Sequence, residues 1–148
     1  MKTLPIVWKR LVADGRTCPR CASTQEAVLG AMAKLQAALQ PLGIRPTLDM
    51  QALDDPDFRA DPSESNRLWI AGRPLEEWLG GCVGTSPCCT VCGDLSCRTV
   101  QVGGRVYEAI PEELIVRAAL RAASAMTGVE AAAARASPAC CTSRCDGR

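Results

Sequence analysis

The sequence predicts an α/β fold built from a strand–helix–strand unit, a later β-hairpin and a C-terminal helix. Three patterns indicate this class. Apolar residues fill positions 3–12, a helical apolar stripe follows, and alternating apolar residues return from Ile44. Two further strand patterns flank Gly103-Gly104, which is typical of a type I′ hairpin turn. A length of 148 residues and a hydrophobic content of 47% fit one domain with a tail.

The first half of the chain supplies the strand–helix–strand unit. Apolar residues on both faces of 3–12 indicate a strand buried inside a sheet. A helix is expected over 22–40, where a proline and a glycine follow it. Its apolar stripe consists of Val28, Met32, Leu35 and Leu39. The second strand begins at Ile44, and Pro46 argues against a central place for it in the sheet.

The second half predicts shorter elements. Residues 54–66 are acidic and contain two prolines, which favours a loop or a short helical turn. A short strand is expected at 67–71 and a helical turn at 74–79, and the hairpin occupies 98–109. The final helix opens at Pro111 with two glutamates favourably placed on its dipole. Its apolar stripe consists of Leu114, Ala118, Ala122 and Met126.

We therefore expect one domain over residues 1–127, with a cysteine-rich loop inserted at 82–97, and a flexible alanine-rich tail over 128–148. The formal net charge is +1 and both signs are spread along the chain, so nucleic acid is not expected as a partner. No apolar stretch is long enough to span a bilayer, so membrane insertion is not expected. The oligomeric state is left open.

Ten cysteines and no histidine dominate the possible chemistry. The absence of histidine excludes Cys/His zinc fingers, histidine-dependent triads and imidazole acid–base catalysis. The N-terminal residues lack the apolar run and cleavage site of a secretory signal, so we expect a cytoplasmic protein. In a reducing compartment, cysteines at this density indicate thiol exchange or metal binding rather than a disulfide framework.

The first cysteine group is Cys18-Pro19-Arg20-Cys21, between a buried strand and the start of a helix. Unpaired N–H groups and the dipole at a helix N-terminus stabilise a thiolate, and Arg20 adds a positive charge. Pro19 suits the first helical turn and stiffens the loop. We assign Cys18 as the more exposed, nucleophilic thiolate and Cys21 as the resolving thiol. The alternative is that the two cysteines are half of a static zinc site.

At this junction the chain resembles the thioredoxin-like superfamily, and the Cys-Pro-x-Cys form is similar to glutaredoxin-type motifs. The resemblance implies a thiol–disulfide oxidoreductase site at Cys18 and Cys21. The strand at 67–71 and the hairpin followed by a helix fit it. Thioredoxins place a cis-proline before the third strand, where this chain has Ser65-Asn66. Residues 17–21, 65–78 and 110–117 also resemble an uncharacterised bacterial family of thioredoxin-like domains, over residues 1–127.

The second cysteine group lies within residues 82–97 and predicts a metal site. Cys89 and Cys92 have the spacing of a metal knuckle, and Cys82 and Cys97 can complete a four-thiolate zinc tetrahedron. An iron–sulfur cluster also uses four thiolates, but the spacing does not match ferredoxin motifs. A disulfide-stapled loop is a further alternative. The candidate ligands are Cys82, Cys88, Cys89, Cys92 and Cys97.

The third cysteine group ends the chain with Cys140, Cys141 and Cys145. Three thiolates within six residues suit a soft metal or metalloid ion. The group resembles the paired-cysteine ends of mercury- and arsenic-handling proteins. A flexible chain from Thr127 to Cys140 spans about 20 Å, enough to approach Cys18. The alternative is a disordered tail without a role.

Three cysteine groups are more than an oxidoreductase needs. We therefore expect a cytoplasmic protein that binds soft metal or metalloid ions through cysteine thiolates and transfers them to a metal-accepting protein. Zinc is the expected cofactor, and an iron–sulfur cluster or a soft ion is the alternative. The first alternative function is a thiol–disulfide oxidoreductase with a thiol redox partner, in which Cys18 attacks and Cys21 resolves. The second is a zinc-stabilised interaction domain without turnover.

Overall fold

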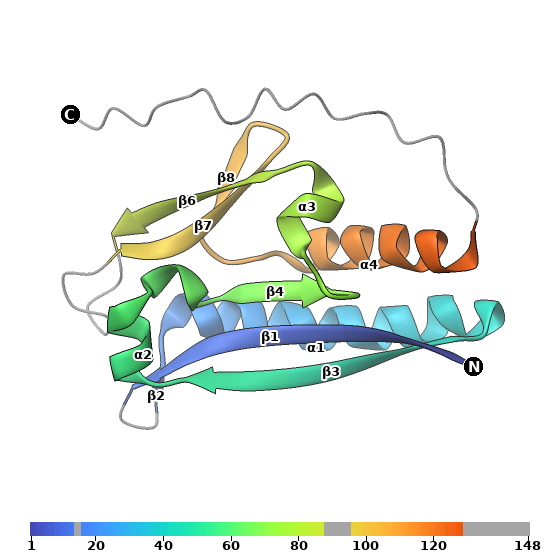
Figure 1. The fold of residues 1–148 in the computed structure, drawn as a ribbon, viewed down its shortest axis with the longest axis horizontal. Helices are drawn as coiled ribbons and strands as arrows, with labels where there is room; N and C mark the ends of the chain where they lie inside the picture. Colours follow the sequence, from blue (N-terminus) through green and yellow to red (C-terminus); the bar gives the residue numbers. More distant parts are fainter. Residues whose placement is uncertain (14–15, 88–95, 129–148) are drawn as a thin grey trace.

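The computed structural model describes residues 1–13, 16–87 and 96–128, and these form two sheets and four α-helices (Figure 1). The strands are β1 (Lys2–Ala13), β2 (Arg16–Thr17), β3 (Ile44–Leu53), β4 (Arg67–Ile70), β5 (Arg73–Pro74), β6 (Cys82–Pro87), β7 (Ser96–Val102) and β8 (Arg105–Tyr107). The helices are α1 (Pro19–Leu39), α2 (Asp55–Ala60), α3 (Leu75–Leu79) and α4 (Glu112–Thr127), and two 3₁₀ turns are η1 (Gln40–Leu42) and η2 (Pro62–Glu64). The predicted α/β class is confirmed.

Strand β1 is the centre of the main sheet, which we define as β1 to β5. It pairs in parallel with β3 from Lys2 opposite Ile44 to Leu11 opposite Leu53, and antiparallel with β4 on its other side. The predicted β1–α1–β3 unit is therefore present. In the described part of the chain β3 pairs with β1 alone, so it lies at an edge, where Pro46 is tolerated.

Helices α1 and α4 pack together and cover one face of the main sheet (Figure 1). The side chains of Leu4, Ile6 and Trp8 alternate along β1 and are 0–1% exposed. Residues Val7 and Lys9, which point to the opposite face, are only half-buried. The main sheet thus has one covered face and one face that is more open to solvent.

The second sheet contains β6, β7 and β8. The predicted hairpin is confirmed, because Val102 pairs with Arg105 and both turn glycines have positive φ, 58° at Gly103 and 79° at Gly104. Among the described strands, the hairpin is not paired with the main sheet. It pairs instead with β6, so the segment that we expected to be an inserted loop begins as a strand. The alternating β-branched residues Val83 and Thr85 were the signal for this strand.

One helix differs from its predicted bounds, and the acidic region adopts the helical one of its two expected forms. Helix α1 begins at Pro19, three residues earlier than expected, because proline is well suited to the first helical position. The acidic region before β4 forms α2 and η2, each capped by an aspartate. The side chain of Asp54 accepts from the backbone N–H of Asp57, and that of Asp61 accepts from Ser63. Within the described residues, no helix is long and apolar enough to cross a membrane.

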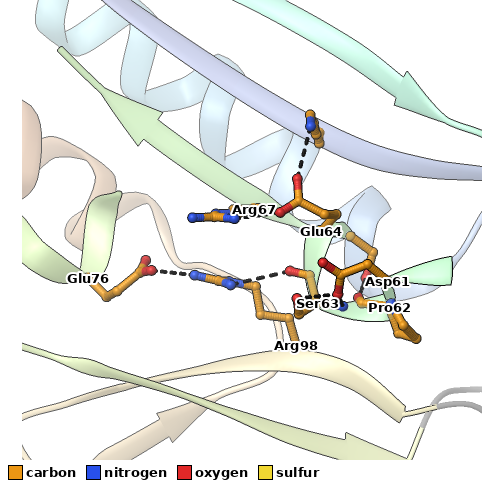
Figure 2. Close-up of polar contacts among 9 residues, drawn as sticks. Asp61, Pro62, Ser63, Glu64, Arg67, Glu76 and Arg98 are labelled. Carbon is orange, nitrogen blue, oxygen red and sulfur yellow. Dashed lines mark hydrogen bonds and ion pairs between the residues drawn. The ribbon is translucent and has the colours of Figure 1, made fainter. Parts of the chain in front are cut away.

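A buried ion pair fastens the second sheet to the rest of the domain (Figure 2). Arg98 on β7 contacts the carboxylate of Glu76 on α3, and the two side chains are 5% and 10% exposed. Arg98 also donates through Nη1 to the backbone carbonyl of Ser63 on η2, at 3.2 Å. One guanidinium therefore connects β7, α3 and η2.

We predict that Glu76→Gln lowers the free energy of unfolding by about 3–5 kcal/mol, because it leaves a buried guanidinium without its counter-charge. The matched control is Glu77→Gln, which removes an exposed pair with Arg73 and is expected to cost less than about 1 kcal/mol. Urea unfolding measures both values. Equal stability of the two variants would contradict the anchoring role of Glu76.

Candidate thiol site

The first cysteine group lies at the N-terminus of the longest helix. Cys18 is the N-cap of α1, with φ −66° and ψ 157°, and its carbonyl accepts from the N–H of Ala22 at 2.9 Å. Cys21 lies in the first turn. We call Cys18 and Cys21 the cysteine pair. The unpaired N–H groups of a helix N-terminus favour negative charge, so the observed location suits a thiolate.

Both residues of the cysteine pair are buried, with 2% of each exposed. The prediction that Cys18 is more exposed than Cys21 is therefore wrong. Both cysteines belong to the buried hydrophobic cluster of the domain, so neither thiol lies at the surface. The end of β6 and the turn after β8 contact the first turn of α1 through Arg20.

Arg20, between the two cysteines, contacts both of these segments. Its Nη2 donates to the carbonyl of Pro87 at 2.7 Å and lies 3.1 Å from Oε1 of Glu108. The same carboxylate oxygen accepts from the hydroxyl of Ser86 at 3.3 Å. We expected Arg20 to supply positive charge beside Cys18, and the structure directs its guanidinium to Pro87 and Glu108.

Asn66 directly precedes β4, and no peptide bond among the described residues is cis. Its backbone has φ 55°, a left-handed conformation that asparagine tolerates better than most residues. Its side chain accepts from Nε1 of Trp8 at 3.0 Å and donates to the carbonyl of Glu108 at 3.3 Å. Asn66 therefore holds the turn that contains Glu108 against the core.

A further contact joins that turn to α1, where the N–H of Ile110 donates to Oγ1 of Thr24 at 3.1 Å. Thr24, Asn66 and Glu108 were not among the predicted site residues. Their roles come from contacts between residues distant in sequence, such as the 86 positions between Thr24 and Ile110. The polar residue Asn66 directly before a strand was the one signal available in the sequence.

The predicted metal ligands divide into two sets. Cys88, Cys89, Cys92, Cys140, Cys141 and Cys145 lie outside the described residues. Of the others, Cys82 begins β6, and Cys97 on β7 is 4% exposed and disulfide-bonded, a state that competes with metal ligation. Within the ranges that the structure describes, no group of three or more cysteine or acidic side chains is arranged to hold a metal ion.

The strand register separates Cys82 from Cys97. Cys82 pairs with Gln101 and Cys97 pairs with Ser86, so the two cysteines are four positions apart along the ladder, about 13 Å. Thiolates on one zinc ion lie about 4 Å from each other. The two cysteines therefore cannot bind the same ion while β6 and β7 are paired, which corrects the predicted tetrahedron that included both.

A separate charge cluster lies near η2. Glu64 contacts Lys9 on β1 at 2.9 Å and also pairs with Arg67. These two bonds lower the pKa of the Glu64 carboxyl, with the hydrogen bond from Lys9 as the largest cause. Both cations also lie against the ring of Trp69, Lys9 at 5.3 Å and Arg67 at 4.6 Å from its centroid.

The fold and the site together define an α/β domain whose long helix begins at a buried Cys-Pro-Arg-Cys motif. The chain belongs to the family described as Domain of unknown function (DUF2703), whose model matches residues 4–119. An uncharacterized protein of the archaeon Archaeoglobus fulgidus is 42% identical over 112 residues, which cover 76% of this chain and 82% of the relative. No solved structure matches the chain. The expected likeness to an uncharacterised family is confirmed, and the relative is archaeal where we expected bacteria.

We predict that Glu64 contributes to stability at neutral pH and that this contribution disappears in acid. Because its pKa is lowered in the folded state, the stabilisation is present above the ordinary carboxyl pKa of about 4.3 and is lost as the pH falls through the folded value. Urea unfolding at pH 7 and at about pH 3 tests this. Glu64→Gln is expected to destabilise the protein at pH 7 and to have little effect near pH 3, whereas a pH-independent effect would contradict the assignment.

Proposed function

We propose that this protein is a thiol–disulfide oxidoreductase that reacts through the cysteine pair on a thioredoxin-like scaffold. The observation that carries the proposal is the location of Cys18 as the N-cap of α1, with Cys21 in the first turn. The order of β1, α1, β3, β4 and a terminal helix supports the scaffold. The helix N-terminus supports a reactive thiolate, because its N–H groups and dipole stabilise negative charge.

The reaction would proceed by two thiol exchanges. The thiolate of Cys18 attacks one sulfur of a partner disulfide, a mixed disulfide forms, and the other partner sulfur leaves as a thiolate. The thiolate of Cys21 then attacks the sulfur of Cys18, and the second partner sulfur leaves. Two electrons pass from the cysteine pair to the partner, and the new Cys18–Cys21 disulfide is reduced again by an external thiol such as glutathione.

We predict that Cys21→Ser accumulates a mixed disulfide on Cys18 when the reduced protein is mixed with oxidised glutathione, because the resolving thiol is absent. Cys18→Ser is expected to form no adduct at Cys21 on the same time scale. Peptide mass mapping locates the adduct, and Cys82→Ser is the control for a cysteine outside the pair. Equal adduct formation in all three variants would sink the proposed roles.

Soft-ion binding and transfer is the second candidate function, and one observation favours it. Pro87 pairs with Ser96, so the paired strands β6 and β7 bring together the two ends of residues 88–95, whose sequence contains three cysteines. Three cysteines in so short a segment suit zinc or a thiophilic ion, and ligand exchange with another thiol protein would transfer it. A zinc-stabilised domain without turnover would share the same ligands.

We predict that at most one of Cys82→Ser and Cys97→Ser weakens zinc binding, because the register keeps the two apart. Native mass spectrometry of the reduced protein with added zinc, under anaerobic conditions, gives the stoichiometry for each variant. The triple variant of Cys88, Cys89 and Cys92 to Ser is expected to abolish binding. Retention of zinc by that triple variant would remove the second candidate function.

A further inference from the structure

A buried cysteine pair cannot exchange with a partner disulfide unless the structure opens. Each residue of the pair is 2% exposed, and thiol exchange needs the attacking thiolate in line with the two sulfur atoms of the partner disulfide. Arg20 stands between the two cysteines in the sequence, and its contacts join the first turn of α1 to the end of β6 and to the turn after β8.

The end of β6 and the turn after β8, which we call the cover, are joined to Arg20 through one carboxylate. Glu108 accepts from Nη2 of Arg20 at 3.1 Å and from the hydroxyl of Ser86 at 3.3 Å. Its backbone carbonyl accepts from Asn66. Glu108 thus contacts α1, β6 and the residue before β4 from a single position in the turn after β8. The N-terminal end of α1 and the end of β6 lie at the same end of the molecule (Figure 1).

The closed arrangement is held loosely enough to open. The side chain of Glu108 is 57% exposed, so its ion pair with Arg20 is screened by water and salt. Nη1 of Arg20 is buried and has no hydrogen-bond partner among the described residues. A buried donor without a partner disfavours the closed state, and the guanidinium regains water when it leaves the cover.

We propose that Glu108 is a positioning residue that holds Arg20 under the second sheet and so controls access to Cys18. In the open state Arg20 leaves Glu108 and Pro87, and the first turn of α1 becomes accessible to a partner disulfide. This inference rests on the proposed thiol function, but access to Cys18 can be measured without any redox turnover.

The test is the rate at which iodoacetamide alkylates Cys18 in the reduced full-length protein, followed by peptide mass mapping. Glu108→Gln is expected to raise that rate about threefold to fivefold, the range that a half-exposed ion pair contributes. Glu108→Asp should restore part of the protection. The matched control is Glu113→Gln, which removes an exposed pair with Arg117 on the same helix that follows the turn, and it should leave the rate unchanged.

Two further measurements separate local opening from unfolding. Alkylation through a local opening is insensitive to low urea, whereas alkylation through global unfolding accelerates with urea. In the unmodified protein, a change from low salt to about 1 M sodium chloride should also speed alkylation of Cys18, because the ion pair is screened. The salt measurement decides the matter if Glu108→Gln fails to fold.

The inference is overturned if Glu108→Gln leaves the alkylation rate at its original value, if the rate rises only in parallel with global unfolding, or if salt has no effect. Failure of the proposed function looks different. In that case alkylation responds to Glu108 as expected, but Cys21→Ser forms no mixed disulfide with oxidised glutathione. If the cysteine pair exchanges with glutathione but its alkylation rate does not depend on Glu108, the proposed function is supported and the role of Glu108 is contradicted.

Discussion

The ion pair between Arg98 and Glu76 is the constraint on which the arrangement of the two sheets depends. Both groups are buried, and a buried charge is tolerated only with a counter-charge and further hydrogen bonds. Arg98 finds them on α3 and on η2, and these are the elements on either side of β4 in the chain. The second sheet is consequently held beside the main sheet, where the end of β6 contacts Arg20 in the first turn of α1.

Much of the main sheet could be predicted because its signals are local. Apolar residues on both faces of β1, the apolar stripe of α1 and the alternation that starts at Ile44 each fit one kind of element. Gly103-Gly104 likewise fixed the hairpin turn. The partner of the hairpin could not be predicted, since strand pairing between β6 and β7 depends on distant contacts. The cysteines and Gly84 also weakened the strand pattern of β6.

The candidate site was likewise predictable only in part. The helix-start position of Cys18 and Cys21 follows from Pro19 and the strand before it, so it was predictable. The contacts of Arg20 with Glu108 and Pro87 were not, because both of these residues belong to another part of the chain. For the second cysteine group, the sequence suggested a contact that the structure does not contain. Sequence spacing suggested that Cys82 and Cys97 meet, and the ladder keeps them apart.

The contacts between α1 and the turn after β8 have a consequence for folding during synthesis. Synthesis runs from the N-terminus, so α1 emerges from the ribosome well before the turn that contains Glu108. The contact between Thr24 and Ile110 joins residues 86 positions apart, so it forms only after the later residue has been made. The same holds for the pair between Arg20 and Glu108, and the first turn of α1 therefore gains both contacts late in synthesis.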